Sequence, residues 1–123
     1  MKRVLVVDDN LDILHLVQMI LKSNGFEVLA TPKGGDVMAS CETFAPQAIL
    51  LDVFLSGYDG REICKSLKQN EKTKNIPVIM FSAHCKSEEI VACKADDFIA
   101  KPFEVNELVS KLKFSVESQH CNN

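Results

Sequence analysis

The sequence lacks a long apolar segment. Its longest apolar run, around residues 48–55, is interrupted by Asp52, whereas a membrane-spanning helix needs about 20 consecutive apolar residues. The first residues lead directly into a short apolar run and two aspartates, without the longer apolar stretch and small-residue cleavage site of a secretory signal. We therefore expect a cytoplasmic protein with no membrane contact.

An excess of basic residues and paired cysteine ligands are also missing. Lys and Arg number 14 against 17 Asp and Glu, a net charge of −3, whereas nucleic-acid binding typically needs a basic surface. The five cysteines include no C-x-x-C pair, and the three histidines are scattered. These patterns argue against direct nucleic-acid binding and against a structural zinc site, and they favour reduced thiols.

Short apolar segments alternate with segments of helical periodicity along the whole chain. Strands are predicted at residues 4–7, 26–30, 48–51, 76–81 and 98–100, each followed by a helical pattern. Continuous apolar strands between amphipathic helices are typical of a parallel sheet that is covered on both faces. We predict an α/β fold with a doubly wound five-stranded parallel sheet, flavodoxin-like strand order 2-1-3-4-5, and helices on both faces. One domain would span residues 1–118, and a polar tail residues 119–123.

Polar residues follow four of the five predicted strands. They are Asp8 and Asp9 after the first strand, Asp52 after the third, Ser82 after the fourth and Lys101 after the fifth. Ligands bind at this edge of doubly wound sheets, although each residue alone is more often a helix cap, a turn residue or a surface charge. Three carboxylates on one rim repel one another unless positive charge lies among them. Lys101 and a divalent cation would supply it, and oxygen ligands favour Mg²⁺, with Mn²⁺ possible.

Four segments resemble the response-regulator receiver domain of two-component signalling. They are VLVVDDN (4–10), LDVFLSGYDG (51–60), MFSA (80–83) and ADDFIAKPF (95–103). The resemblance covers about residues 2–117, and the order and spacing of the segments together are specific to that family. The chain is therefore expected to be a receiver domain, either standing alone or cut from a longer protein.

The resemblance implies a role for each polar residue at the rim. Asp52 would be the phosphoacceptor. Asp8, Asp9 and Asp52 would hold Mg²⁺ together with the backbone carbonyl of Phe54. Phosphoryl transfer depends mainly on positioning and charge neutralisation, which this set of residues would provide.

Four further roles follow from the same resemblance. Ser82 and Lys101 would contact the phosphoryl oxygens, and the bond between Lys101 and Pro102 would be cis. Phe98 would be the switch aromatic, which moves inward when Ser82 is drawn to the phosphoryl group. Because a conformational equilibrium shifts only through differential interaction with its two states, Ser82 is where that difference would arise.

Four positions bear on the lifetime of the phosphorylated state or depart from the family pattern. Phe54 and His84 would border the path of the attacking water, Phe54 as an obstruction and His84 as a possible base. Ser56 stands where proline is frequent, which predicts a less rigid loop. Lys94 stands where glycine is frequent, which leaves the geometry of that turn open.

The function expected from the sequence is a Mg²⁺-dependent switch rather than an enzyme. A sensor histidine kinase or a histidine phosphotransfer protein would donate the phosphoryl group, and only self-phosphorylation and self-dephosphorylation are expected as catalysis. A downstream protein would bind the face of the fourth helix, fifth strand and fifth helix. The alternatives are an aspartyl-nucleophile phosphohydrolase, which would place an Asp-x-Asp pattern after the first strand, and a receiver-like module that is never phosphorylated.

Overall fold

The computed structural model describes residues 2–83 and 87–121 of the chain. Five parallel strands form the central sheet, in the order β2-β1-β3-β6-β7. The strands are β1 (Lys2–Val7), β2 (Phe26–Thr31), β3 (Ala48–Asp52), β6 (Val78–Ser82) and β7 (Asp97–Ala100). The α-helices are α1 (Leu11–Ser23), α2 (Val37–Phe44), α3 (Gly60–Gln69), α4 (Ser87–Ala92) and α5 (Val105–Cys121). This arrangement confirms the predicted flavodoxin-like fold.

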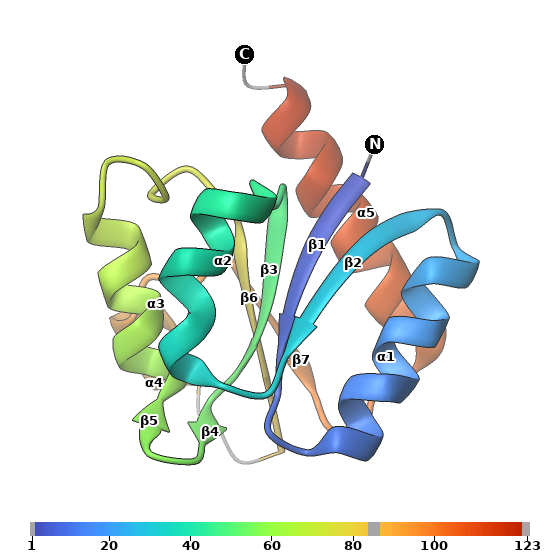
Figure 1. Cartoon of the computed structure of the whole chain (residues 1–123), viewed down its shortest axis with the longest axis horizontal. Helices are drawn as coiled ribbons and strands as arrows, with labels where there is room; N and C mark the ends of the chain where they lie inside the picture. The colour runs from blue at the N-terminus through green and yellow to red at the C-terminus, as the bar shows by residue number, and fades with distance from the viewer. Residues whose placement is uncertain (1, 84–86, 122–123) are drawn as a thin grey trace.

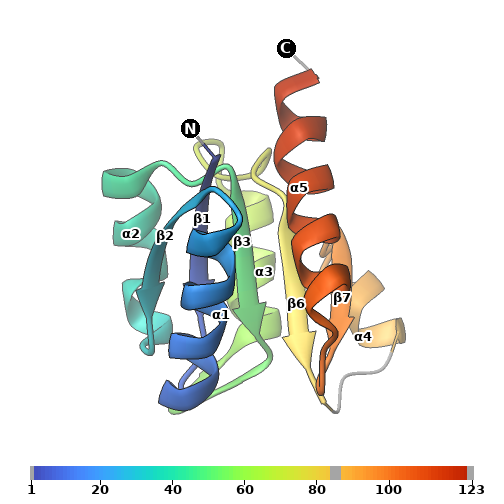
Figure 2. The ribbon, with the colours of Figure 1, turned by 90° about the vertical axis from the view of Figure 1, so that its right-hand side faces the viewer.

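Helices cover both faces of the sheet, as predicted. Figures 1 and 2 show α1 and α5 on one face, and α2, α3 and α4 on the other. Successive side chains of a strand point to opposite faces, so Val4 and Val6 pack under α1 and α5 while Leu5 and Val7 pack under α2 and α3. The strands are buried on both sides, and this explains why they read as continuous apolar runs.

A small antiparallel hairpin interrupts the alternation and was not predicted. It consists of β4 (Phe54–Leu55) and β5 (Tyr58–Asp59), directly after β3. A one-turn 3₁₀ helix, η1 (Gly34–Asp36), likewise lies between β2 and α2. Elements of two or three residues are too short to show a hydrophobic period, so the sequence pattern could not reveal them.

Several element boundaries differ from the sequence pattern; β1, for example, begins at Lys2 rather than at residue 4. The fourth strand of the sheet begins at Val78 rather than Ile76, because the Ile76 N–H bonds the Thr73 carbonyl in a turn at 3.0 Å. Helix α5 continues to Cys121, beyond the fading of the apolar pattern near Glu117. Helical hydrogen bonds can propagate without further burial, so a polar sequence does not itself end the helix.

Lys94 takes the backbone conformation for which glycine is the usual residue. Its φ is +64° in the turn between α4 and β7, so the turn geometry is left-handed despite the side chain. Such a residue costs on the order of 1 kcal/mol or more relative to glycine. Separately, no helix among residues 2–83 and 87–121 has the length and hydropathy that a membrane span requires.

Candidate functional site

The predicted site residues gather at the carboxyl edge of the sheet. Asp8 and Asp9 follow β1, Asp52 ends β3, Ser82 ends β6, and Lys101 follows β7. Asp8 is fully buried, Asp52 and Ser82 are nearly so, and Asp9 is half-buried. The polar residues that the sequence places directly after the strands therefore form one contiguous site beside the central strands.

Three carboxylates and one ammonium form the centre of the site. One oxygen from each of Asp8, Asp9 and Asp52 lies within 4.8 Å of the others. The Lys101 Nζ lies 2.7 Å from Asp8 Oδ2 and 3.3 Å from Asp52 Oδ2. With all four groups ionised, one positive charge faces three negative charges, so the cluster has an uncompensated negative charge.

Burial and charge both act on the acidity of Asp52. Burial, followed by repulsion from the Asp8 carboxylate, raises the pKa of Asp52 from its usual 3.8 to about 6, while Lys101 opposes this rise. Desolvation disfavours the charged form of a carboxyl group, and a neighbouring negative charge adds to that effect. With a pKa of about 6, the Asp52 carboxyl group is still mostly ionised at neutral pH.

Backbone contacts fix the orientation of these carboxylates. The Asn10 N–H donates to Asp8 Oδ1 at 2.9 Å, and the Phe54 N–H lies 3.4 Å from Asp52 Oδ1. Gly60 packs directly on the backbone of Asp52, where a Cβ atom would overlap the carbonyl oxygen. Glycine is therefore required at the start of α3 for the chain to return beside the site.

Aromatic side chains support Lys101, and the sequence reasoning missed this feature. The Lys101 Nζ lies 4.6 Å from the ring centroid of Phe81, whose ring packs edge-on against Phe103 at 5.4 Å. The Lys101–Pro102 bond is cis, as expected, and the Lys101 N–H donates to the Ser82 carbonyl at 3.2 Å. The available signals were two phenylalanines, one directly before Ser82 and the other directly after Pro102.

Two of the three remaining predicted residues lie in the part of the chain that the structure describes. Phe98 is half-buried on β7 and packs against the core under α2 and α3, and Lys111 Nζ donates to its carbonyl at 2.7 Å. Phe54 lies on β4 with its side chain 52% exposed. His84 lies outside the described residues.

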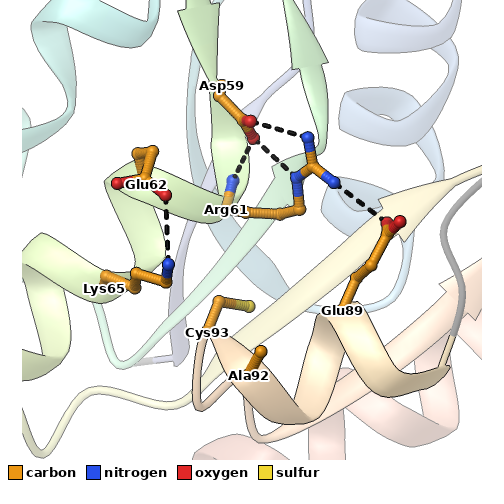
Figure 3. Close-up of a pocket in the computed structure, with 7 residues that line it drawn as sticks. All are labelled: Asp59, Arg61, Glu62, Lys65, Glu89, Ala92 and Cys93. Carbon is orange, nitrogen blue, oxygen red and sulfur yellow. Dashed lines mark hydrogen bonds and ion pairs between the residues drawn. The ribbon is translucent and has the colours of Figure 1, made fainter.

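A second polar cluster connects the hairpin to α4. Arg61 donates two side-chain hydrogen bonds to Asp59, at 2.9 and 2.7 Å, and its Nη1 lies 3.1 Å from Glu89 Oε2. Figure 3 shows these residues around a pocket of about 220 Å³ between α3 and α4. The Arg61 guanidinium also lies 5.9 Å from the Phe54 ring centroid. Arg61 thus joins the chain that follows Asp52 to α4.

The donor set at the rim fits a hard divalent cation. Its candidate ligands are carboxylate oxygens, and the described part of the chain brings no histidine or cysteine into this group. The excess negative charge supplies the electrostatic need for a cation. Mg²⁺ typically uses one or two protein carboxylates and retains waters, so the three carboxylates here offer enough ligands for one ion. Fold and site together define a class of doubly wound α/β domains with a cluster of carboxylates at the carboxyl edge of the sheet, which could hold a metal ion.

Comparisons with known proteins identify the family. The chain matches the response regulator receiver domain over residues 4–113 and belongs to that family. It is 36% identical over 117 residues to the alkaline phosphatase synthesis transcriptional regulatory protein PhoP of Bacillus subtilis, covering 91% of this chain and 47% of that protein. The chain spans about half the length of the curated relatives it matches.

Solved structures agree with this assignment. The receiver domain of NtrX from Brucella abortus is 33% identical with a TM-score of 0.83, covering 93% of this chain and 98% of that one. A CheY-like receiver domain protein from Methanospirillum hungatei is 26% identical with a TM-score of 0.91, covering 100% and 99%. Receiver domains are the signalling switches of two-component systems and interact with histidine kinases.

Proposed function

We propose that this receiver domain is a Mg²⁺-dependent switch that accepts a phosphoryl group on Asp52 from a histidine kinase or a histidine phosphotransfer protein. The observation that carries the proposal is the Lys101 ammonium between Asp8 and Asp52, with Asp9 close by. A carboxylate attacks an anionic phosphoryl group only when both charges are masked. The cluster provides one masking charge in Lys101 and a set of ligands for the second.

The residues divide the chemistry among them. Asp8, Asp9, Asp52 and the Phe54 carbonyl would hold Mg²⁺, which when bound supplies charge neutralisation for the carboxylates and the phosphoryl oxygens. An Asp52 oxygen attacks phosphorus, a new P–O bond forms, and the bond to the donor's imidazole nitrogen breaks. The Lys101 ammonium donates hydrogen bonds to the phosphoryl oxygens during this step. Hydrolysis by water later returns Asp52 to a free carboxylate.

Output depends on the added charge. Phosphorylation adds about two negative charges and three acceptor oxygens. Ser82 and Lys101 would donate hydrogen bonds to these oxygens. When the Ser82 hydroxyl moves toward the phosphoryl group, Phe98 on the neighbouring strand moves inward. A downstream protein, rather than nucleic acid, binds the changed face of α4, β7 and α5, where Val91 and Val105 are exposed.

The test is phosphorylation from a small donor. With Mg²⁺ and acetyl phosphate, the intact protein should gain the mass of one phosphoryl group, and EDTA should prevent the gain. Asp52→Asn should gain none, whereas the control Asp12→Asn, at an exposed position of α1, should be labelled like wild type. Equal labelling of Asp52→Asn would exclude Asp52 as acceptor. Steady-state turnover of a small phosphoester would instead favour the hydrolase.

A further inference from the structure

The turn of the β4–β5 hairpin is tied to Asp9 by a single residue. The Ser56 N–H donates to Asp9 Oδ2 at 3.0 Å, and the Ser56 hydroxyl donates to the same oxygen at 2.9 Å. The sequence predicted a less rigid loop at this serine. The two bonds instead restrain the loop against a residue 47 positions earlier in the chain.

The distribution of these bonds over the carboxylate is uneven. Both fall on Oδ2, and among the described residues nothing donates to Asp9 Oδ1. Carboxylates that bind metals are typically held by hydrogen bonds from neighbouring groups, and losing such a partner typically costs about 10- to 100-fold in affinity. Ser56 therefore leaves one Asp9 oxygen available while it fixes the other.

We propose that Ser56 is a positioning residue for the divalent cation, acting through Asp9. It orients the Asp9 carboxylate so that Oδ1 is the available ligand atom, and it holds the hairpin turn beside the site. The inference rests on the proposed function, because it assigns Ser56 a role in that cation site. The backbone N–H of Ser56 is one of the two donors in this role, and a proline at this position could not supply it.

The geometry of the turn permits a clean test. Ser56 and Gly57 are the two central residues of the hairpin turn, and of these only Gly57 has a positive φ, +76°. A positive φ restricted to the third residue is typical of a type II turn, in which proline is common at the second residue. Ser56→Pro should therefore keep the turn while removing both donors. Ser56→Ala removes only the hydroxyl, and Ser56→Thr retains both donors.

The experiment measures cation affinity rather than phosphorylation. Mg²⁺ would be titrated while following the fluorescence of Tyr58, the one tyrosine in a chain without tryptophan, and the titration repeated with Mn²⁺ by paramagnetic resonance. We expect binding about 3-fold weaker in Ser56→Ala and about 10-fold or more weaker in Ser56→Pro. Ser56→Thr should bind within 2-fold of wild type, as should the control Ser110→Ala on α5. Thermal unfolding without cation would check that each variant is folded.

Each outcome bears on a different statement. Equal or tighter binding in Ser56→Pro and Ser56→Ala would overturn the positioning role, and tighter binding would mean that Ser56 competes with the cation for Asp9. Failure of Ser56→Thr to retain affinity would also overturn it, because the donors would then not be what matters. Absence of cation binding in wild type would instead overturn the cation site of the proposed function, and the role of Ser56 with it.

Discussion

Both edges of the sheet carry a lysine against acidic side chains, but the charge balance differs. At the carboxyl edge, Lys101 Nζ lies between Asp8 and Asp52, and Asp9 completes a group in which one positive charge meets three negative charges. Nothing in this cluster neutralises the remaining negative charge. It is therefore an incomplete arrangement, whose excess of negative charge is suited to a cation.

At the amino edge the same residue types form a balanced clasp. Lys68 Nζ donates to Asp96 Oδ2 at 2.6 Å and to the Ile76 carbonyl at 2.9 Å, and Asp96 Oδ2 also accepts from the Val78 N–H at 2.8 Å. One ammonium meets one carboxylate, and the remaining partners are neutral backbone groups. The clasp joins the end of α3 to the starts of β6 and β7.

The comparison separates charge balance from burial. The two lysine side chains are similarly buried, at 12% exposed for Lys68 and 15% for Lys101. Burial of a lysine beside an aspartate does not by itself indicate function. The excess of carboxylates does, because it leaves negative charge that a bound cation can neutralise.

Replacing Lys101 should have the largest effect. Lys101→Met removes the ammonium that, under the proposed function, would contact the transferred oxygens, and loss of one such stabilising group typically costs about 10²- to 10³-fold in rate. We expect phosphorylation from acetyl phosphate to slow by at least about 100-fold. The measurement is the initial rate of mass gain, with the exposed Lys65→Met as control. A rate within 3-fold of wild type would show that Lys101 is only structural.

The matched change at the other edge should affect stability and leave phosphorylation intact. Lys68→Met removes the hydrogen bonds of Lys68 to Asp96 and to two backbone carbonyls. With about 1 kcal/mol for a typical bond and more for charged partners, we expect the free energy of unfolding to fall by about 2 to 3 kcal/mol. Urea denaturation measures it, with exposed Lys72→Met as control. A large loss of phosphorylation rate in a folded Lys68→Met would remove the distinction between the edges.

Asp52→Asn should stabilise the protein at neutral pH when no divalent cation is present. The folded-state pKa of Asp52 is raised from 3.8 to about 6, so between these values the folded protein binds more protons than the unfolded chain. Its contribution to the free energy of unfolding therefore falls as pH rises from about 4 to 6. We expect Asp52→Asn to be more stable than wild type at pH 7 by on the order of 2 kcal/mol, and nearly equal below pH 4.

Denaturation curves at pH 4 and pH 7 test this prediction. Asp12→Asn, at an exposed position, controls for the loss of a surface charge. A variant no more stable than wild type at pH 7 would mean that Lys101 compensates the Asp52 charge completely. The carboxyl edge would then be as balanced as the amino edge.

The sequence was sufficient to predict the fold and the polar residues at the carboxyl edge, because each follows from a pattern within a short segment of the chain. Apolar runs located the strands, and residues directly after a strand must lie at its carboxyl end. The sequence could not give contacts that depend on distances between segments. Phe81 supports Lys101, and Ser56 holds Asp9, across strands and loops that only the folded chain brings together.

Where the sequence departed from the family pattern, the local inference was incomplete. The prediction of a less rigid loop at Ser56 rests on its backbone freedom alone. Its N–H and hydroxyl instead restrain the loop by donating to Asp9. Lys94 left the turn geometry open, and the structure gives it a left-handed φ of +64°, with its N–H donating to the Val91 carbonyl at 3.1 Å. At Ser56, contacts with a distant segment outweigh a local conformational preference of about 1 kcal/mol.

The smallest predicted effect concerns Phe54 and the access of water to Asp52. Phe54 follows Asp52 by two residues, its N–H points to Asp52 Oδ1, and its half-exposed ring lies beside the Arg61 guanidinium. Such a ring offers no hydrogen bond to orient a water for in-line attack, and its bulk hinders entry. Phe54→Asn should therefore shorten the lifetime of phosphorylated Asp52 by roughly tenfold, about 1.4 kcal/mol of barrier.

Decay of the phosphoprotein after donor removal, with Mg²⁺ present, measures this lifetime. Phe114→Asn, which removes an exposed ring from α5, should decay like wild type, and equal or slower decay in Phe54→Asn would show that Phe54 does not shield the acyl phosphate.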